Sequence, residues 1–233
     1  MSNFDLILFD ADNTLFDFNK AQEHALKTAI ASTLEKYHIP YSDEILHKYE
    51  KINQDLWDKY ELGFVTKDQL QVKRFSDLFD ILHVEEDAVH FNTQYMTALS
   101  KGSCLLDGAQ ELCETLSRSC KLALVTNGVS KTQHKRFENS TIKDYFTDIF
   151  VSEDAGFQKP RKEYFDYVFE HLGTIEKERM IIVGDSLSSD MKGGNNAGIT
   201  TCWFNPHSLS NNSDAVCDYE VHKLSEVIPI VLA

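Results

Sequence analysis

The sequence is short of positive charge and has no long apolar run. Its 23 lysines and arginines are outnumbered by 37 aspartates and glutamates, so the formal net charge is −14. Proteins that bind nucleic-acid polymers or acidic membranes need a positive face, which argues against both partners. No stretch approaches the roughly 20 apolar residues of a membrane span, and no secretory signal pattern opens the chain. We therefore expect a soluble, cytoplasmic protein.

Paired cysteines and clustered histidines are also missing. The five cysteines are odd in number and contain no Cys-x-x-Cys pair: Cys104, Cys113, Cys120, Cys202 and Cys217. This usage fits reduced thiols better than a disulfide framework or a zinc site. The nine histidines include no His-x-His and no His-Glu-x-x-His pattern. A histidine-based metal centre is therefore not expected.

Residues from about 18 to about 100 have helical periodicity. Four segments each carry an apolar face: Ala21, Ala25, Leu26, Ala29, Ile30 and Leu34; Ile45, Tyr49, Ile52 and Leu56; Leu70, Phe75, Leu78, Phe79 and Leu82; Ala88, Phe91, Tyr95 and Leu99. Ser42 and Thr66 stand at N-cap positions, and Gly63 can end the helix before Thr66. The pattern predicts a helical bundle over residues 18–102.

From Leu105 onward, helices and short apolar strands alternate. Helices are predicted at 109–118, 131–139, 162–172 and 190–197, and strands at 121–126, 148–151, 180–185 and 200–204. Continuous apolar strands between helices indicate a parallel sheet covered on both faces, and the apolar segment 6–9 must join it. We predict an α/β fold, a Rossmann-like doubly wound parallel sheet. Residues 1–17 and 103–233 form this core, and the helical domain 18–102 is inserted after the first strand.

Polar residues follow four of these strands, at the edge where open parallel sheets bind ligands. Asp10 and Asp12 follow the first strand and Thr126-Asn127-Gly128 the second; Lys159 lies after the third, and Asp185 and Asp190 after the fourth. Each group alone is as easily a turn or a solvated surface. Acids, a hydroxyl, an amide and a lysine converging on one edge are the composition expected of a magnesium-dependent phosphoryl-transfer site.

In these segments the chain resembles the haloacid dehalogenase superfamily of phosphohydrolases. Its motifs correspond to Asp10-Ala11-Asp12-Asn13-Thr14, Val125-Thr126-Asn127-Gly128, Lys159-Pro160 and Gly184-Asp185-Ser186-Leu187-Ser188-Ser189-Asp190. The match spans the whole chain, because the helical insert corresponds to the family's cap domain. The commonest family pattern has glycine where this chain has Asn13, and asparagine is the residue that best replaces glycine at positive φ.

The resemblance implies a role for each motif residue. Asp10 would be the nucleophile that forms an aspartyl-phosphate, and Asp12 the general acid and base. Mg²⁺ would be held by Asp10, the backbone carbonyl of Asp12, and Asp185. Thr126, Asn127 and the Gly128 amide would bind phosphate oxygens, and Lys159 would neutralise the transferring group.

Two acidic residues keep alternative interpretations. Asp190 is either a metal ligand acting through water or the N-cap of the following helix. Glu153 either orients Lys159 or is a surface residue.

Four functions compete on these residues. A phosphomonoester hydrolase needs both Asp10 and Asp12; a haloalkanoate dehalogenase lacks the second acid. A mutase of the β-phosphoglucomutase type shares the whole set, whereas an inactive interaction module should have lost a motif.

The first motif followed by a helical insert is most similar to the YjjG-like pyrimidine 5′-nucleotidases. This similarity implies a small phosphate ester as the binding partner, a nucleoside monophosphate, with phosphoglycolate or sugar phosphates as the alternative, in a monomer or weak homodimer.

Overall fold

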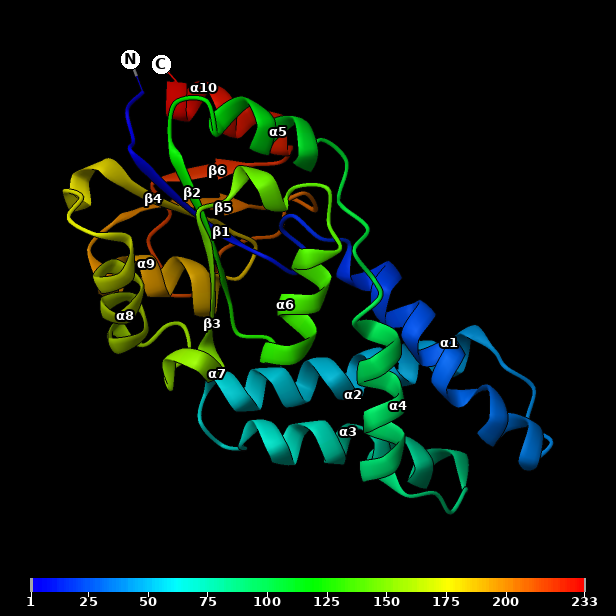
Figure 1. The fold of residues 1–233 in the computed structure, drawn as a ribbon. Coiled ribbons are helices and arrows are strands. Elements are labelled where there is room, and N and C mark those ends of the chain that lie inside the picture. The colour runs from blue at the N-terminus through cyan, green and yellow to red at the C-terminus, as the bar shows by residue number, and fades with distance from the viewer. Residues whose placement is uncertain (1, 233) are drawn as a thin grey trace. The chain divides into compact units, whose positions relative to one another are not determined.

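The computed structural model describes residues 2–232 and divides the chain into two compact units, which are described separately here (Figure 1). The first unit runs to Phe18 and resumes at Ser103, and the second spans Asn19–Gly102. Within residues 2–232, no helix is both long and apolar enough to cross a membrane.

The first unit is built on a six-stranded sheet in which every neighbouring pair is parallel. The strands are β1 (Leu6–Asp10), β2 (Lys121–Thr126), β3 (Asp148–Val151), β4 (Met180–Gly184), β5 (Thr200–Phe204) and β6 (Tyr219–Val221), in the spatial order β3-β2-β1-β4-β5-β6. The order reverses at β1, so the sheet is doubly wound. The predicted fold class is confirmed.

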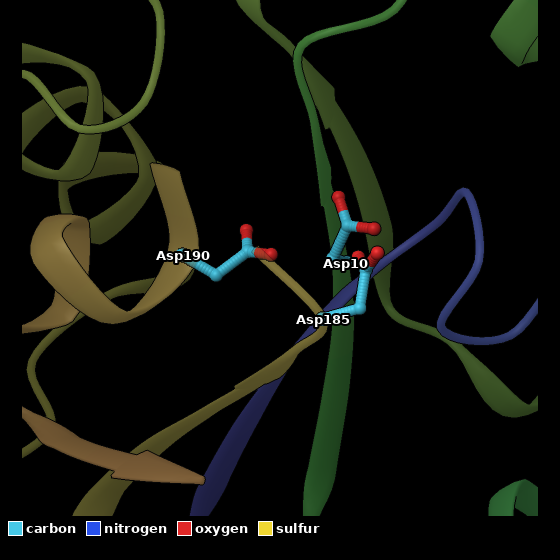
Figure 2. Close-up of side chains that lie close together, drawn as sticks. All are labelled: Asp10, Asp185 and Asp190. Atoms are coloured by element: carbon cyan, nitrogen blue, oxygen red, sulfur yellow. The ribbon is translucent and has the colours of Figure 1, made fainter. Parts of the chain in front are cut away.

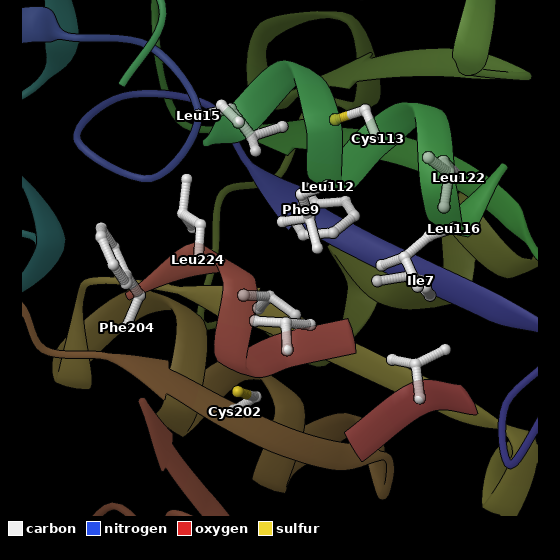
Figure 3. Close-up of a cluster of buried hydrophobic side chains, with 14 of the residues drawn as sticks. Ile7, Phe9, Leu15, Leu112, Cys113, Leu116, Leu122, Cys202, Phe204 and Leu224 are labelled. Carbon is white, nitrogen blue, oxygen red and sulfur yellow. The ribbon is translucent and has the colours of Figure 1, made fainter. Parts of the chain in front are cut away.

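Helices cover both faces of this sheet. Its helices are α5 (Ala109–Leu116), α6 (Ser130–Glu138), α7 (Ser152–Ala155), α8 (Lys162–Leu172), α9 (Lys192–Ala197) and α10 (Val227–Leu232). Because successive strand residues point to opposite faces, Ile7 and Phe9 of β1 pack with Leu112 and Leu116 of α5 on one side (Figure 3). Leu8, on the other face of β1, belongs to a second cluster with α8 and α9. All five β1 residues are buried, which explains the continuous apolar run of the first four.

The second unit consists almost entirely of helices. They are α1 (Phe18–Lys36), which begins at the unit boundary, α2 (Asp43–Glu61), α3 (Lys67–Leu82) and α4 (Ala88–Leu99). Aromatic residues join three of them: Tyr49 of α2 stacks on Phe75 of α3 with centroids 5.5 Å apart, and Tyr95 of α4 lies 5.1 Å from the same Phe75 ring. These positions are fully buried, as the periodicity predicted.

The C-terminal part of the sheet differs from the sequence expectation. Strand β6 and helix α10 were not predicted, because three and six residues are too short for a periodic signal. The helix expected at 190–197 is also divided: a π-helical turn, η3 (Leu187–Met191), precedes α9. This turn determines where Asp190 points, as described below.

The two expected N-caps of the helical unit are not equivalent. Thr66 accepts a hydrogen bond from the Gln69 amide, and the Gln69 side chain accepts one from the Thr66 amide, which completes a capping box. Ser42 has extended backbone geometry but no side-chain cap bond.

We therefore expect Thr66→Ala to lower the free energy of unfolding by about 1 kcal/mol and Ser42→Ala to change it by a few tenths or less. Urea denaturation of both variants measures this, and equal losses would contradict the assignment.

Candidate active site

A tight turn after β1 places the first two aspartates. The amides of Leu15 and Phe16 both donate to the carbonyl of Ala11, at 3.0 and 2.8 Å. Asn13 has a φ of 61°, the left-handed conformation that asparagine tolerates better than most residues, so the expectation for this position is confirmed. The turn reverses the chain immediately after Asp12. Asp10 is thereby held at the end of β1 and Asp12 in the loop beyond it.

Three carboxylates converge at the ends of β1 and β4. Asp10 ends β1, Asp185 follows β4, and Asp190 projects from the π-helical turn towards them (Figure 2). Each offers one oxygen, and the three oxygens lie within 4.8 Å of one another. Gly184 permits this arrangement, because a Cβ there would lie 2.3 Å from an Asp190 oxygen. The buried Thr14 hydroxyl donates to Asp185 at 3.3 Å and helps to orient it.

Lys159 lies between two of these acids. Its Nζ donates to Asp10 Oδ1 at 2.6 Å, to Asp190 Oδ1 at 2.7 Å and to the Val125 carbonyl at 2.9 Å. The side chain is 1 % exposed, so these three acceptors satisfy an ammonium that water barely reaches. Asp10 Oδ2 makes no hydrogen bond within residues 2–232. One oxygen of Asp10 is therefore fixed, and the other remains available.

Burial and charge perturb the acid–base properties of the cluster. Burial raises the pKa of Asp10 from 3.8 to about 7, although Lys159 acts in the opposite direction. Burial and the neighbouring carboxylates of Asp10 and Asp190 hold the pKa of Asp185 well above its usual value. Burial alone would lower the pKa of Lys159, but the two acids that it contacts raise it above the usual lysine value.

The segment after β2 supports Lys159 from the backbone. The Asn127 side chain donates to the Lys159 carbonyl and accepts from the Lys159 amide, both at 2.9 Å. Thr126 Oγ1 accepts from the Gly128 amide at 3.1 Å. Asn127 therefore holds the Lys159 loop, a contact that the phosphate-binding expectation did not include.

Two residues of α6, absent from the sequence prediction, hold the Asp12 carboxylate. Gln133 Nε2 donates to Asp12 Oδ2 at 2.5 Å, and Arg136 Nη1 donates to Asp12 Oδ1. Both side chains are buried, at 4 % and 1 % exposed. Their spacing of three residues on a helix was the available signal, because such residues share one helix face. Nothing in the sequence indicated that this face would meet Asp12.

The contacts of Asp190 and Glu153 test the alternatives that the sequence left open for these two acids. The N-cap of the π-helical turn is Ser186, and Asp190 instead accepts from Lys159 and from the Ser186 amide. The helix-cap interpretation of Asp190 is therefore wrong. Glu153 accepts from the Ser130 amide at the start of α6, and all three Lys159 donors go elsewhere. Glu153 thus does not orient the Lys159 ammonium.

The donor set fits a hard divalent cation. Mg²⁺ prefers oxygen ligands, and here carboxylate oxygens from Asp10, Asp185 and Asp190 approach one another in a partly buried site. Within residues 2–232 one lysine, Lys159, pairs with these acids, and the raised pKa values of Asp10 and Asp185 indicate that the cluster favours additional positive charge, from protons or from a cation. The Asp12 side chain faces Gln133 and Arg136, which leaves its backbone carbonyl for the metal role expected of this residue.

Comparison with known proteins identifies the family. The family model of haloacid dehalogenase-like hydrolases matches residues 4–198. The chain is 42 % identical to the HAD-hydrolase YfnB of Bacillus subtilis over 99 % of this chain and 97 % of that protein. It is 34 % identical to the pyrimidine 5′-nucleotidase YjjG of Escherichia coli, covering 96 % of each chain. It is 33 % identical to the pyrimidine 5′-nucleotidase PynA of Streptococcus pneumoniae, covering 97 % of this chain and 94 % of PynA.

A solved structure agrees with these sequence matches. A crystal structure of Bacillus subtilis YfnB bound to magnesium, which reveals interdomain movement, superposes with a TM-score of 0.92 at 41 % identity. It covers 99 % of this chain and 100 % of its own. The parallel sheet and the acidic strand ends define a hydrolase core, and the chain belongs to the haloacid dehalogenase-like hydrolase family. Its relatives include pyrimidine 5′-nucleotidases.

Removing the Lys159 charge should make stability more dependent on pH. In Lys159→Met, Asp10 and Asp190 lose their buried counter-ion, and breaking such a pair costs about 3–5 kcal/mol when both acids stay ionised. At pH 5 Asp10, whose pKa is raised to about 7, takes up a proton instead, whereas in the unfolded chain, where its pKa is near 4, it has already released one. We therefore expect the loss in unfolding free energy to be several-fold larger at pH 8 than at pH 5.

The parent protein provides the sign of this effect. The Asp10 pKa is raised to about 7, so the folded state keeps a proton that the unfolded state loses, and stability declines as pH rises from about 4 to about 7. In Lys159→Met, the free energy of unfolding should fall more steeply over the same rise in pH. Urea denaturation in chelator at both pH values measures the difference. Lys162→Met, which removes an exposed lysine paired with Asp166, is the control and should cost less than about 1 kcal/mol at either pH. An equal loss at both pH values for Lys159→Met would exclude the buried ion cluster.

Proposed function

We propose that this hydrolase is a magnesium-dependent phosphomonoesterase that acts through an aspartyl-phosphate on Asp10. The observation that carries the proposal is the Asp10 carboxylate at the end of β1: one oxygen is fixed by Lys159, and the other makes no hydrogen bond within the described chain. A nucleophile needs such an oriented and available oxygen. The second acid, Asp12, favours phosphate-ester chemistry over dehalogenation.

The proposed reaction has two displacements. Asp10 Oδ2 attacks phosphorus, the bond from phosphorus to the ester oxygen breaks, and the Asp12 carboxyl gives its proton to the departing alcohol. Water then attacks the same phosphorus and gives a proton to Asp12. The bond from phosphorus to Asp10 breaks, which releases inorganic phosphate and restores both acids. The Thr126 hydroxyl, which already accepts from the Gly128 amide, lies at the neighbouring strand end, where its O–H could donate to a phosphate oxygen.

A cation completes the charge balance of this site. Asp10 and Asp185, with Asp190 beside them and the Asp12 carbonyl, would hold Mg²⁺, which supplies positive charge to the phosphate oxygens. Lys159 does not have this task alone, because its three hydrogen bonds go to protein acceptors. Its proposed contribution is to fix Asp10 and Asp190 and to lower the net negative charge that an anionic substrate meets.

The proposed substrates are pyrimidine nucleoside 5′-monophosphates. Support comes from two relatives named as pyrimidine 5′-nucleotidases, each covering more than nine-tenths of this chain at 33–34 % identity. The core residues bind phosphate and metal only, so discrimination between esters has to come from the helical unit, the proposed cap, and from loops near it. YfnB, whose structure reveals interdomain movement, is a precedent for mobility between such units.

Replacing the nucleophile should abolish turnover while leaving the fold intact. We expect Asp10→Asn to lower kcat by about three orders of magnitude or more, because the amide cannot form the phospho-adduct. Phosphate release and rapid-quench mass spectrometry measure the loss and locate the adduct on Asp10 of the parent. Exhaustive chelation should also stop turnover, and added Mg²⁺ should restore it. The control is Asp166→Asn, an exposed acid on α8. Near-parental activity of Asp10→Asn would refute the mechanism, and activity that survives chelation would refute the metal.

Selectivity can be tested independently of the core chemistry. We expect uridine, thymidine or deoxyuridine monophosphate to be cleaved with a kcat/KM about 10-fold or more above that of purine monophosphates and glycolate phosphate. A released-phosphate screen across nucleoside monophosphates and sugar phosphates provides the comparison. If a hexose phosphate or glycolate phosphate exceeds every nucleotide, or if β-glucose 1-phosphate is isomerised, the nucleotidase assignment fails while the phosphoryl-transfer core stands.

A further inference from the structure

The Asp12 carboxylate is held on both oxygens by one helix. Gln133 donates to Oδ2 and Arg136 to Oδ1, and a further bond of 3.2 Å from Arg136 Nη1 to Gln133 Oε1 ties the two donors together. A surface carboxylate with no structural role would be hydrated by solvent water and would not need protein donors. Two buried donors on a rigid helix instead restrict the position of the Asp12 side chain, which itself is 24 % exposed.

Three other features preserve this contact. Gly128 has no side chain where a Cβ would lie 2.2 Å from Gln133 Nε2, so the glycine leaves the space that Gln133 occupies. Gln133 Nε2 also donates to Thr126 Oγ1 at 3.2 Å, which links Asp12 to the end of β2. The Arg136 guanidinium lies over the rings of Phe16 and Phe18, 5.2 and 5.7 Å from their centroids. These cation–π contacts help to hold the guanidinium that reaches Asp12.

We propose that Gln133 and Arg136 are positioning residues that hold Asp12 where it can exchange a proton with the ester oxygen. The inference rests on the proposed phosphatase function and adds α6 to its machinery. Arg136 reaches the reaction through the Asp12 carboxylate, and Gln133 through Asp12 and the Thr126 hydroxyl, so the loss of Arg136 should affect proton delivery to the leaving group and spare the attack of Asp10.

A structural ion pair is the competing explanation, and leaving-group chemistry separates the two. Phenyl phosphate and 4-nitrophenyl phosphate have nearly the same shape, but 4-nitrophenolate departs readily without a proton, whereas the more basic phenolate benefits from one. The parameter kcat/KM reports only the steps up to formation of the phospho-adduct, so the later attack of water does not enter. An effect on the acid step therefore appears as a difference between the two esters.

The experiment measures kcat/KM for both esters in Mg²⁺ with the parent, Gln133→Met, Arg136→Met and Arg136→Lys. We expect Arg136→Met and Gln133→Met to lower kcat/KM for phenyl phosphate by about 10- to 100-fold, within the contribution of general acid catalysis. For 4-nitrophenyl phosphate we expect Arg136→Met to lose less than about 3-fold, which also shows that this variant is folded. Arg136→Lys, which keeps a charged donor, should recover part of the loss. Lys135→Met removes a charge from the exposed face of the same helix and should match the parent on both esters.

The same substitutions in an Asp12→Ala background complete the test. If Arg136 acts through Asp12, Arg136→Met should lower kcat/KM no further in that background. Equal losses on both esters, or a full additional loss without Asp12, would overturn the positioning role and leave an ordinary structural ion pair. If the parent cleaves neither ester nor any nucleotide, the proposed function itself fails before any variant is compared. Failure of the nucleotide preference alone leaves this test intact, because neither ester carries a base.

Discussion

The buried contact between Lys159 and two aspartates constrains most of what surrounds it. Like charges in a partly buried site repel more strongly than in water, and each carboxylate also loses part of its hydration. The Lys159 ammonium offsets two of them directly, Asp10 and Asp190, at 2.6 and 2.7 Å. Its own position depends on Asn127, which binds the Lys159 backbone in both directions. Asn127, which follows β2, thus helps to place Lys159. Lys159 in turn stabilises Asp10 at the end of β1 and Asp190 beyond β4.

The parallel sheet makes this arrangement possible with few supporting residues. Asp10 and Lys159 are 149 positions apart in the chain, but strand ends in a doubly wound sheet meet at one edge. Gly184 and Gly128 contribute by lacking side chains, because each leaves space for a neighbouring polar group, Asp190 in one case and Gln133 in the other. The chain as a whole is acidic, so the buried cations at this edge supply the local positive charge that the proposed phosphate ester would meet.

Two groups of contacts around the site have different tasks. Asp10, Asp185 and Asp190 form one group, with Lys159 as counter-ion and an affinity for further positive charge. Asp12 belongs to the other group, where Arg136 and Gln133 donate to its two oxygens. This separation gives the two carboxylates of the first motif different surroundings although a single alanine lies between them. Two acids with different partners are what a nucleophile and a proton donor require.

Local features of the fold followed from the sequence, because they depend on neighbouring residues. The strand residues are apolar where both faces are covered, the Asn13 turn has its positive φ, and the order of strands and helices indicated the doubly wound sheet. The convergence of the acids required only the rule that parallel strand ends share an edge. What the tertiary structure alone decided was the choice of partners: Lys159 with Asp190, Asn127 with a backbone, and Arg136 with Asp12 across 124 positions. Such pairings depend on how helices pack against the sheet, and side-chain packing between distant segments leaves no periodic signal in the chain.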